Sequence, residues 1–115
     1  MMQKELITAI YNSILVENVE IYKSLFETTK IGPKTTEYWK SSLGLYEKLS
    51  DDDKQILLRI IEQTVIDTIS NMLGAIDGSS TLADFEPEIG LTAENQNIQG
   101  DLQDIFLEMV EKSRK

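Results

Sequence analysis

The chain has 115 residues, of which 20 are Asp or Glu and 11 are Lys or Arg, giving a net charge of −9. This acidity argues against nucleic acids and anionic membranes as partners, because both recruit cationic side chains. The chain also contains no cysteine and no histidine, which excludes disulfides, thiolate chemistry, catalytic triads that need histidine and most zinc sites.

The first predicted helix covers residues 3–29, where apolar side chains recur at steps of three and four residues. The expected inward stripe runs through positions 7, 11, 14, 18, 21 and 25. Asn18 falls on this stripe, so it either bonds a neighbouring segment and fixes the helix register or lies at the edge of the stripe. Gly32 and Pro33 end the helix, because glycine favours a left-handed C-terminal residue and proline cannot continue.

The second predicted helix covers residues 34–49, with Thr35 or Thr36 as its cap. Gly44 lies inside this helix, where glycine costs about 1 kcal/mol relative to alanine, so we expect another helix to approach closely there. One side of the helix is apolar and carries Trp39, Leu43, Tyr46 and Leu49.

The third predicted helix, residues 51–76, is the most apolar part of the chain. Eleven of the 21 residues in 56–76 are Ile, Leu, Val or Met. A helix with this composition must be enclosed by other segments or by a second chain. We therefore expect Ile61 and Val65, which lie halfway along it, to be core residues.

Residues 77–100 contain three glycines and a proline and show no helical period. A short β-hairpin with strands at 86–91 and 95–98 fits this segment, although such a hairpin is marginal without support from the helices. Asp101 is the predicted N-cap of the last helix, residues 101–113, whose apolar stripe packs back onto the other helices.

These elements predict a mainly α fold. We expect a single domain, residues 1–115, shaped as an elongated four-helix bundle with the non-helical insert before the last helix. At about 1.5 Å per residue, the first and third helices each reach about 35–40 Å. A compact domain of this size has a radius of gyration of about 13 Å, so we expect the two long helices to lie antiparallel and to lengthen the bundle.

Three carboxylate arrangements resemble metal sites, and each has a simpler explanation. The aspartates at 51–53 suit the positive N-terminus of a helix capped by Ser50. Residues 77–88 have the length of a calcium loop but carry Leu82 where the turn requires glycine. The third arrangement has the i, i+3 spacing with which helical nucleotide pyrophosphohydrolases bind Mg²⁺, but half of it lies on an outward helix face. It combines Glu17 and Glu20 with Asp101 and Asp104 or with Glu108 and Glu111. We expect no metal and no cofactor.

The pattern favours a small acidic binding protein without catalytic activity. By analogy, immunity proteins, antitoxins and phage-encoded inhibitors neutralise a basic protein partner in this way. The alternative view of the acidic loop is structural, with Phe85, Ile89 and Leu91 covering the bundle. The aromatic pair Tyr38 and Trp39 is a second candidate, either as an interface hot spot or as core and boundary residues. The predicted partner-binding residues are Asp84, Glu86, Glu88, Glu94, Asp101 and Asp104.

Two other functions stay open from the sequence. One is a self-associating structural or regulatory helical protein whose homodimer buries the third helix. The other is a Mg²⁺-dependent helical nucleotide pyrophosphohydrolase. We expect a cytoplasmic location, because the first residues are too polar for a signal peptide and no run approaches the ~18 apolar residues of a membrane span.

Overall fold

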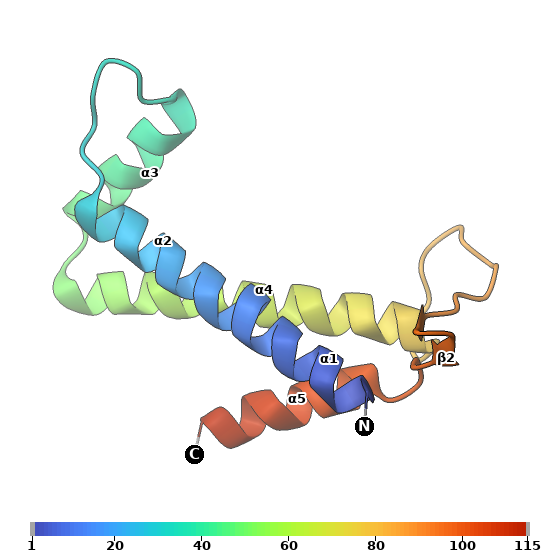
Figure 1. The fold of residues 1–115 in the computed structure, drawn as a ribbon. Helices are drawn as coiled ribbons and strands as arrows, with labels where there is room; N and C mark the ends of the chain where they lie inside the picture. The colour runs from blue at the N-terminus through green and yellow to red at the C-terminus, as the bar shows by residue number, and fades with distance from the viewer. Residues whose placement is uncertain (1, 115) are drawn as a thin grey trace.

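The computed structural model describes residues 2–114 and shows a mainly α-helical protein (Figure 1). In chain order its elements are α1 (Met2–Ile10), the π-helix η1 (Tyr11–Val16), α2 (Glu17–Thr28), α3 (Glu37–Lys48), α4 (Asp51–Asp77), β1 (Thr92–Ala93), β2 (Gln96–Asn97) and α5 (Leu102–Ser113). The four predicted helices are confirmed, with α1, η1 and α2 together forming the first. Among residues 2–114, no helix combines the length and the apolar character needed to cross a membrane.

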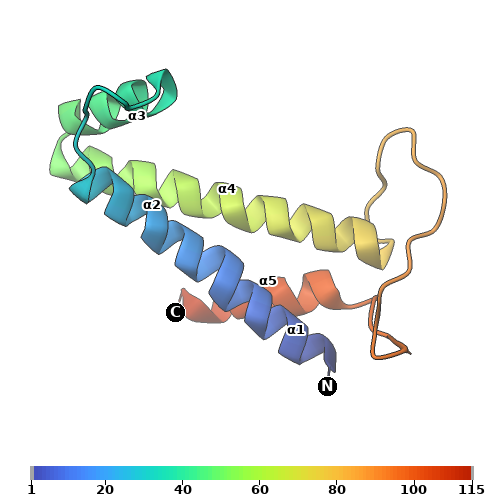
Figure 2. The same cartoon turned by 45° about the horizontal axis from the view of Figure 1, so that its top comes forward.

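The two long helical segments form the frame of the molecule. The rod α1–η1–α2 runs in the opposite direction to α4 and crosses it at an angle, so the two separate toward α3 (Figure 1). Helix α5 packs beside α1 and α4 at the other end (Figure 2). The radius of gyration is 17.7 Å and the extents are 49 × 36 × 25 Å. The predicted elongation is therefore present, but the helices splay instead of forming a closed bundle along their whole length.

The hydrophobic core lies where α1, η1, the C-terminal half of α4 and α5 meet. Ile7, Leu102 and Phe106 are fully buried there, and Tyr11 packs with its ring centroid 6.4 Å from that of Phe106. Side chains from all of these helices meet in the core, so its central residues are shielded from water. The buried members of the core are Ile7, Leu15, Ile66, Ile69, Leu73, Leu102, Phe106 and Val110.

The π-helix η1 moves the apolar stripe of the first helix by one residue. Leu15 is buried, whereas Ile14, Asn18 and Ile21 are exposed. The i→i+5 bonding of a π-helix adds a residue to the turn. Residues four apart, such as Ile7, Tyr11 and Leu15, therefore all face the core, whereas in a continuous α-helix this row would rotate away from it. The predicted stripe through positions 14, 18 and 21 is therefore wrong, and Asn18 has no buried role.

Around α3 the packing is thinner and mainly aromatic. Phe26 of α2 stacks on Tyr46, with ring centroids 4.8 Å apart and an interplanar angle of 15°. The ring centroid of Trp39 lies 6.2 Å from those of both Tyr22 and Phe26, and Leu43 on the same helix is buried. These contacts fix α3 to the end of α2 with a few large side chains rather than with a continuous core.

The core prediction for the third helix is wrong in its details. Ile61 and Val65 are only half-buried, and Val65 alone of the two packs against the core. The buried apolar residues of α4 are Leu58 before this point and Ile66, Ile69 and Leu73 beyond it. The reason is the splay of the helices, which leaves the N-terminal half of α4 without a neighbour on one side.

The helix starts follow the predicted caps, with one shift. Ser50 accepts a hydrogen bond from the backbone N–H of Asp53 at 3.1 Å, and Thr36 accepts one from Trp39 at 3.4 Å. Helix α3 begins at Glu37 and not at 34, because Thr35 closes a turn with Gly32 instead. The close helix approach expected at Gly44 is absent, since within the described chain an added Cβ would meet nothing within 4 Å.

The carboxylate at the end of α4 caps the start of α5. Gly78 adopts the left-handed conformation that ends α4, and the preceding Asp77 accepts hydrogen bonds from the backbone N–H groups of Gly100 and Gln103, at 2.7 and 2.8 Å. Asp101 occupies the predicted N-cap position of α5, but its side chain makes no capping hydrogen bond. Asp77, which belongs to α4, accepts the hydrogen bonds at the start of α5 in its place, and the Asp101 carboxylate is exposed to solvent.

The predicted hairpin exists, but its first strand lies elsewhere. Thr92 pairs with Asn97 and Ala93 with Gln96, so the segment 86–91 is not a strand. The two turn residues, Glu94 and Asn95, both have positive φ, as the mirror-image hairpin turns require. Asparagine tolerates that conformation, and the turn therefore sets the register.

Candidate interaction surfaces

The six predicted partner-binding carboxylates lie in the segment that links α4 to α5 and in the first turns of α5. We call residues 79–104 the acidic end. This segment lies beyond the C-terminus of α4, at the far end of that helix from α3 (Figure 1). All six side chains are exposed, and within residues 2–114 none has an Arg or Lys partner at ion-pairing distance. The acidic end therefore presents uncompensated negative charge to solvent.

Glutamine side chains anchor the second half of the acidic end to the helices. Gln99 accepts a hydrogen bond from the backbone N–H of Leu91 at 2.6 Å and donates one to the carbonyl of Ile89 at 2.7 Å. Gln103 donates to the carbonyl of Ser70 in α4 at 3.0 Å. Leu91 also packs on the core. Residues 89–98 therefore serve the structural role that was the alternative view of this loop.

The first half of the acidic end forms an exposed turn. The backbone N–H of Phe85 donates to the carbonyl of Leu82 at 3.2 Å, and Asp84 between them has φ of 62°. Leu82 and Phe85 are each 49% exposed, so Phe85 does not cover the bundle. Glu86 follows directly. The turn thus displays two apolar side chains among carboxylates.

A depression of about 400 Å³ lies between this turn and the end of α4. Its wall combines apolar side chains with the carboxylates of Asp77, Glu86 and Glu88. A long basic side chain has the matching chemistry, because its stem is apolar and its head is cationic. The lining residues are Ala75, Asp77, Gly78, Ser80, Thr81, Leu82, Phe85, Glu86, Pro87, Glu88, Ile89 and Gln99.

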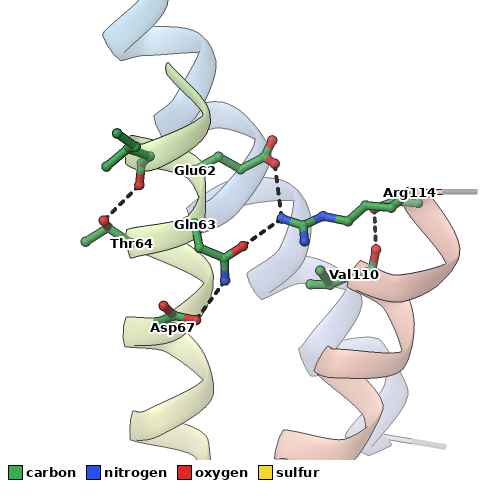
Figure 3. Close-up of polar contacts among 8 residues, drawn as sticks. Glu62, Gln63, Thr64, Asp67, Val110 and Arg114 are labelled. Atoms are coloured by element: carbon green, nitrogen blue, oxygen red, sulfur yellow. Dashed lines mark hydrogen bonds and ion pairs between the residues drawn. The ribbon is translucent and has the colours of Figure 1, made fainter. Parts of the chain in front are cut away.

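The three carboxylate arrangements that resemble metal sites in the sequence do not form clusters in the described residues. Among residues 2–114, no three Asp or Glu side chains are placed to share an ion. Asp77, the first residue of the calcium-loop pattern, is occupied by the cap of α5. Arg114, at the end of α5, donates hydrogen bonds to Gln63 at 3.0 Å and to Glu62 at 3.5 Å on α4 (Figure 3). The carboxylate of Glu62 is therefore already paired with a cation.

A second surface lies at the opposite end of the molecule, between α2, α3 and the N-terminal half of α4. We call it the α3–α4 groove; its volume is about 400 Å³. Of the predicted aromatic pair, Tyr38 lines the groove and is 64% exposed, whereas Trp39 is half-buried in the aromatic cluster. The groove is lined by Tyr22, Phe26, Tyr38, Ser42, Leu45, Leu57, Ile60, Ile61, Thr64 and Val65.

Tyr46 does not line the groove but stacks on Phe26, which does. Burial raises the pKa of its hydroxyl above the ordinary value, and the carboxylates of Glu27 and Asp51 add to the increase. The ammonium of Lys54 lies 4.9 Å from the centre of its ring. The phenol therefore stays neutral at physiological pH and acts as a packing group.

Sequence reasoning missed three features of these surfaces. It did not find the exposed pair Leu82 and Phe85, because apolar loop residues are usually assigned to cover a core. It also missed the open groove and the cap at Asp77. An acidic residue at a helix C-terminus opposes the helix dipole, and that conflict was the signal that the Asp77 carboxylate binds elsewhere. Comparison of the chain with protein-family models, with curated proteins and with solved structures gave no match.

Proposed function

We propose that this protein is a non-catalytic binding protein whose acidic end engages a basic protein partner. The observation that supports this most directly is the exposed turn, in which Leu82 and Phe85 lie beside Asp84 and Glu86, and neither carboxylate forms an ion pair with a residue of 2–114. Apolar anchors surrounded by charge are the usual composition of a binding hot spot with its rim.

The depression below the turn deepens this proposal. An Arg or Lys side chain of the partner would place its methylene groups on Leu82 and Phe85 and its charge near Glu86 and Glu88. Complementary charge mainly accelerates association, so binding should slow as salt is added. We also propose the cytoplasm as the location, since a chain without cysteine gains nothing from an oxidising compartment.

Quantitative affinity capture from a lysate of the native host tests the proposal. Three baits are compared: the unaltered chain, the Glu86→Lys/Glu88→Lys variant, and a matched Glu17→Lys/Glu47→Lys variant. All four positions are exposed and outside the ion pairs, so the two variants have the same net charge and similar stability. We expect at least one basic protein to be retained by the first and third baits and lost from the second.

The captured protein is then used for kinetics. Phe85→Ala should accelerate dissociation, whereas the double lysine variant should mainly slow association and flatten its dependence on salt. Capture of the same proteins in equal amounts by all three baits would show that the acidic end is not the binding surface.

A further inference from the structure

The α3–α4 groove has the composition of an interface core. More than a quarter of the chain is charged, yet none of the ten residues that line the groove carries a charge. Tyr38, Leu45 and Ile60 are each more than half exposed in it. The central parts of stable protein interfaces show this depletion of charge and enrichment of aromatic and aliphatic side chains.

The chain has more surface than a compact monomer of its mass. A folded monomer of 13.1 kDa exposes about 6,400 Å². This chain exposes 8406 Å², a surplus of about 2,000 Å². An obligate homodimer removes about 1,000–2,500 Å² from each chain. The surplus of the whole chain is similar to the area that one subunit of such a dimer buries.

Exposed apolar side chains of α4 lie next to the groove. Ile56 and Ile60 form an exposed apolar ridge one turn apart on α4, at 49% and 57% exposure, and Ile60 also lines the groove. A twofold axis places the ridge of each chain opposite the groove of the other, because both features belong to one patch. A surface that carries both a ridge and a groove can therefore bind its own copy.

Charge favours the groove over the acidic end as the place where a second copy binds. Two chains of charge −9 repel each other, and the repulsion is strongest where carboxylates meet. About 18 Å of helix separates Val65, the last groove residue on α4, from Asp77 at the acidic end. That is roughly twice the screening length at physiological salt, so a dimer through the groove keeps the two acidic ends apart.

We propose that a second copy of this chain covers the α3–α4 groove and forms a twofold-symmetric dimer. The dimer leaves both acidic ends exposed, one on each chain. This inference does not depend on the proposed function, because the two surfaces share no residue.

Sedimentation velocity over a concentration series tests the dimer, with two matched variants on α4. Ile60 and Met72 are exposed to nearly the same extent, 57% and 62%, but only Ile60 lines the groove. Ile60→Asp should raise the dimer dissociation constant by about a hundredfold or more, because a carboxylate would be buried without a partner. Met72→Asp should change it by less than about threefold.

A cross-linking experiment tests the same interface without the aspartate substitutions. The chain has no cysteine, so Thr64→Cys or Met72→Cys introduces a single thiol. A flexible bismaleimide should link two chains through the groove position and not through the position at Met72. Unaltered protein that is monomeric at about 100 μM, or equal effects of the two aspartate variants, overturns the proposal.

Discussion

The two halves of α4 have similar apolar content but different surroundings. In the C-terminal half, Ile66 and Leu73 are enclosed by α1, η1 and α5, and the core is continuous. In the N-terminal half, Leu58 is buried but Ile56 and Ile60 face solvent, and aromatic rings fix the neighbouring α3 to α2. The comparison teaches that an apolar helix does not report by itself how much of it the same chain will enclose.

The largest expected contrast is between two isoleucines of α4. Ile66 is 4% exposed, whereas Ile61 is half-buried at the groove. Ile66→Ala should cost about 2–5 kcal/mol of unfolding free energy, because it leaves a cavity in the core. Ile61→Ala should cost less than about 1.5 kcal/mol, as the side chain is already partly hydrated.

Urea denaturation at low protein concentration measures both variants. If a dimer covers the groove, the loss for Ile61→Ala should grow as the protein concentration is raised, while that for Ile66→Ala should change little. Equal losses at low concentration would contradict the division of α4 into an enclosed and an open half.

The next contrast is between two aspartates at the packed end. Asp77→Ala should cost about 1–2 kcal/mol, because it removes the acceptor for two backbone N–H groups at the start of α5. Asp101→Ala should be nearly neutral, since that carboxylate makes no capping bond. Thermal unfolding followed by circular dichroism compares the two. A larger loss for Asp101→Ala would restore Asp101 as the cap.

Alanine substitution of two helical glycines should change the unfolding free energy in opposite directions at the packed end and the open end. A Cβ at Gly74 would lie 2.8 Å from Nε2 of Gln103, which donates hydrogen bonds to Ser70. Gly74→Ala should therefore destabilise the protein by about 1 kcal/mol, since the lost hydrogen bonds outweigh the gain in helix propensity.

Gly44→Ala should stabilise the protein by about 1 kcal/mol, because nothing in the described chain lies within 4 Å of the added methyl group. The shift of the urea denaturation midpoint shows whether each glycine substitution stabilises or destabilises the protein. A destabilised Gly44→Ala variant would mean that another surface contacts α3 at that point.

The smallest effect concerns an exposed ion pair on α5. A hydrogen bond from Lys112 at 2.8 Å, together with its charge, lowers the pKa of Glu108, and the same contact raises the pKa of Lys112. A lowered carboxyl pKa contributes stability above its ordinary value of 4.5, and this is lost as pH falls through the lowered pKa.

Lys112→Met should return the pKa of Glu108 toward 4.5, as measured by NMR titration, with almost no change in unfolding free energy at neutral pH. A large destabilisation would show that the ion pair contributes to folding stability beyond what is expected of an exposed pair. The raised pKa of Lys112 has the opposite sign, so its contribution is lost only as pH rises through that value.

The helices and most of their caps follow from the sequence alone. Periodic apolar residues, the Ser50 cap and the break at Gly32 and Pro33 act within one or two turns, so local physics is sufficient to place them. The hairpin turn at Glu94 and Asn95 is also local, although its first strand was assigned too early in the chain.

Only the tertiary structure decided which apolar residues are enclosed. The π-turn after Ile10 rotates the stripe so that Leu15 replaces Ile14, and the crossing of α2 and α4 leaves Ile61 at an open groove. Both outcomes depend on how helices far apart in sequence meet. The carboxylates of the acidic end are visible in the sequence. That they form no ion pair with residues 2–114, and that some of them lie beside Leu82 and Phe85, depends on where the fold places residues 79–104.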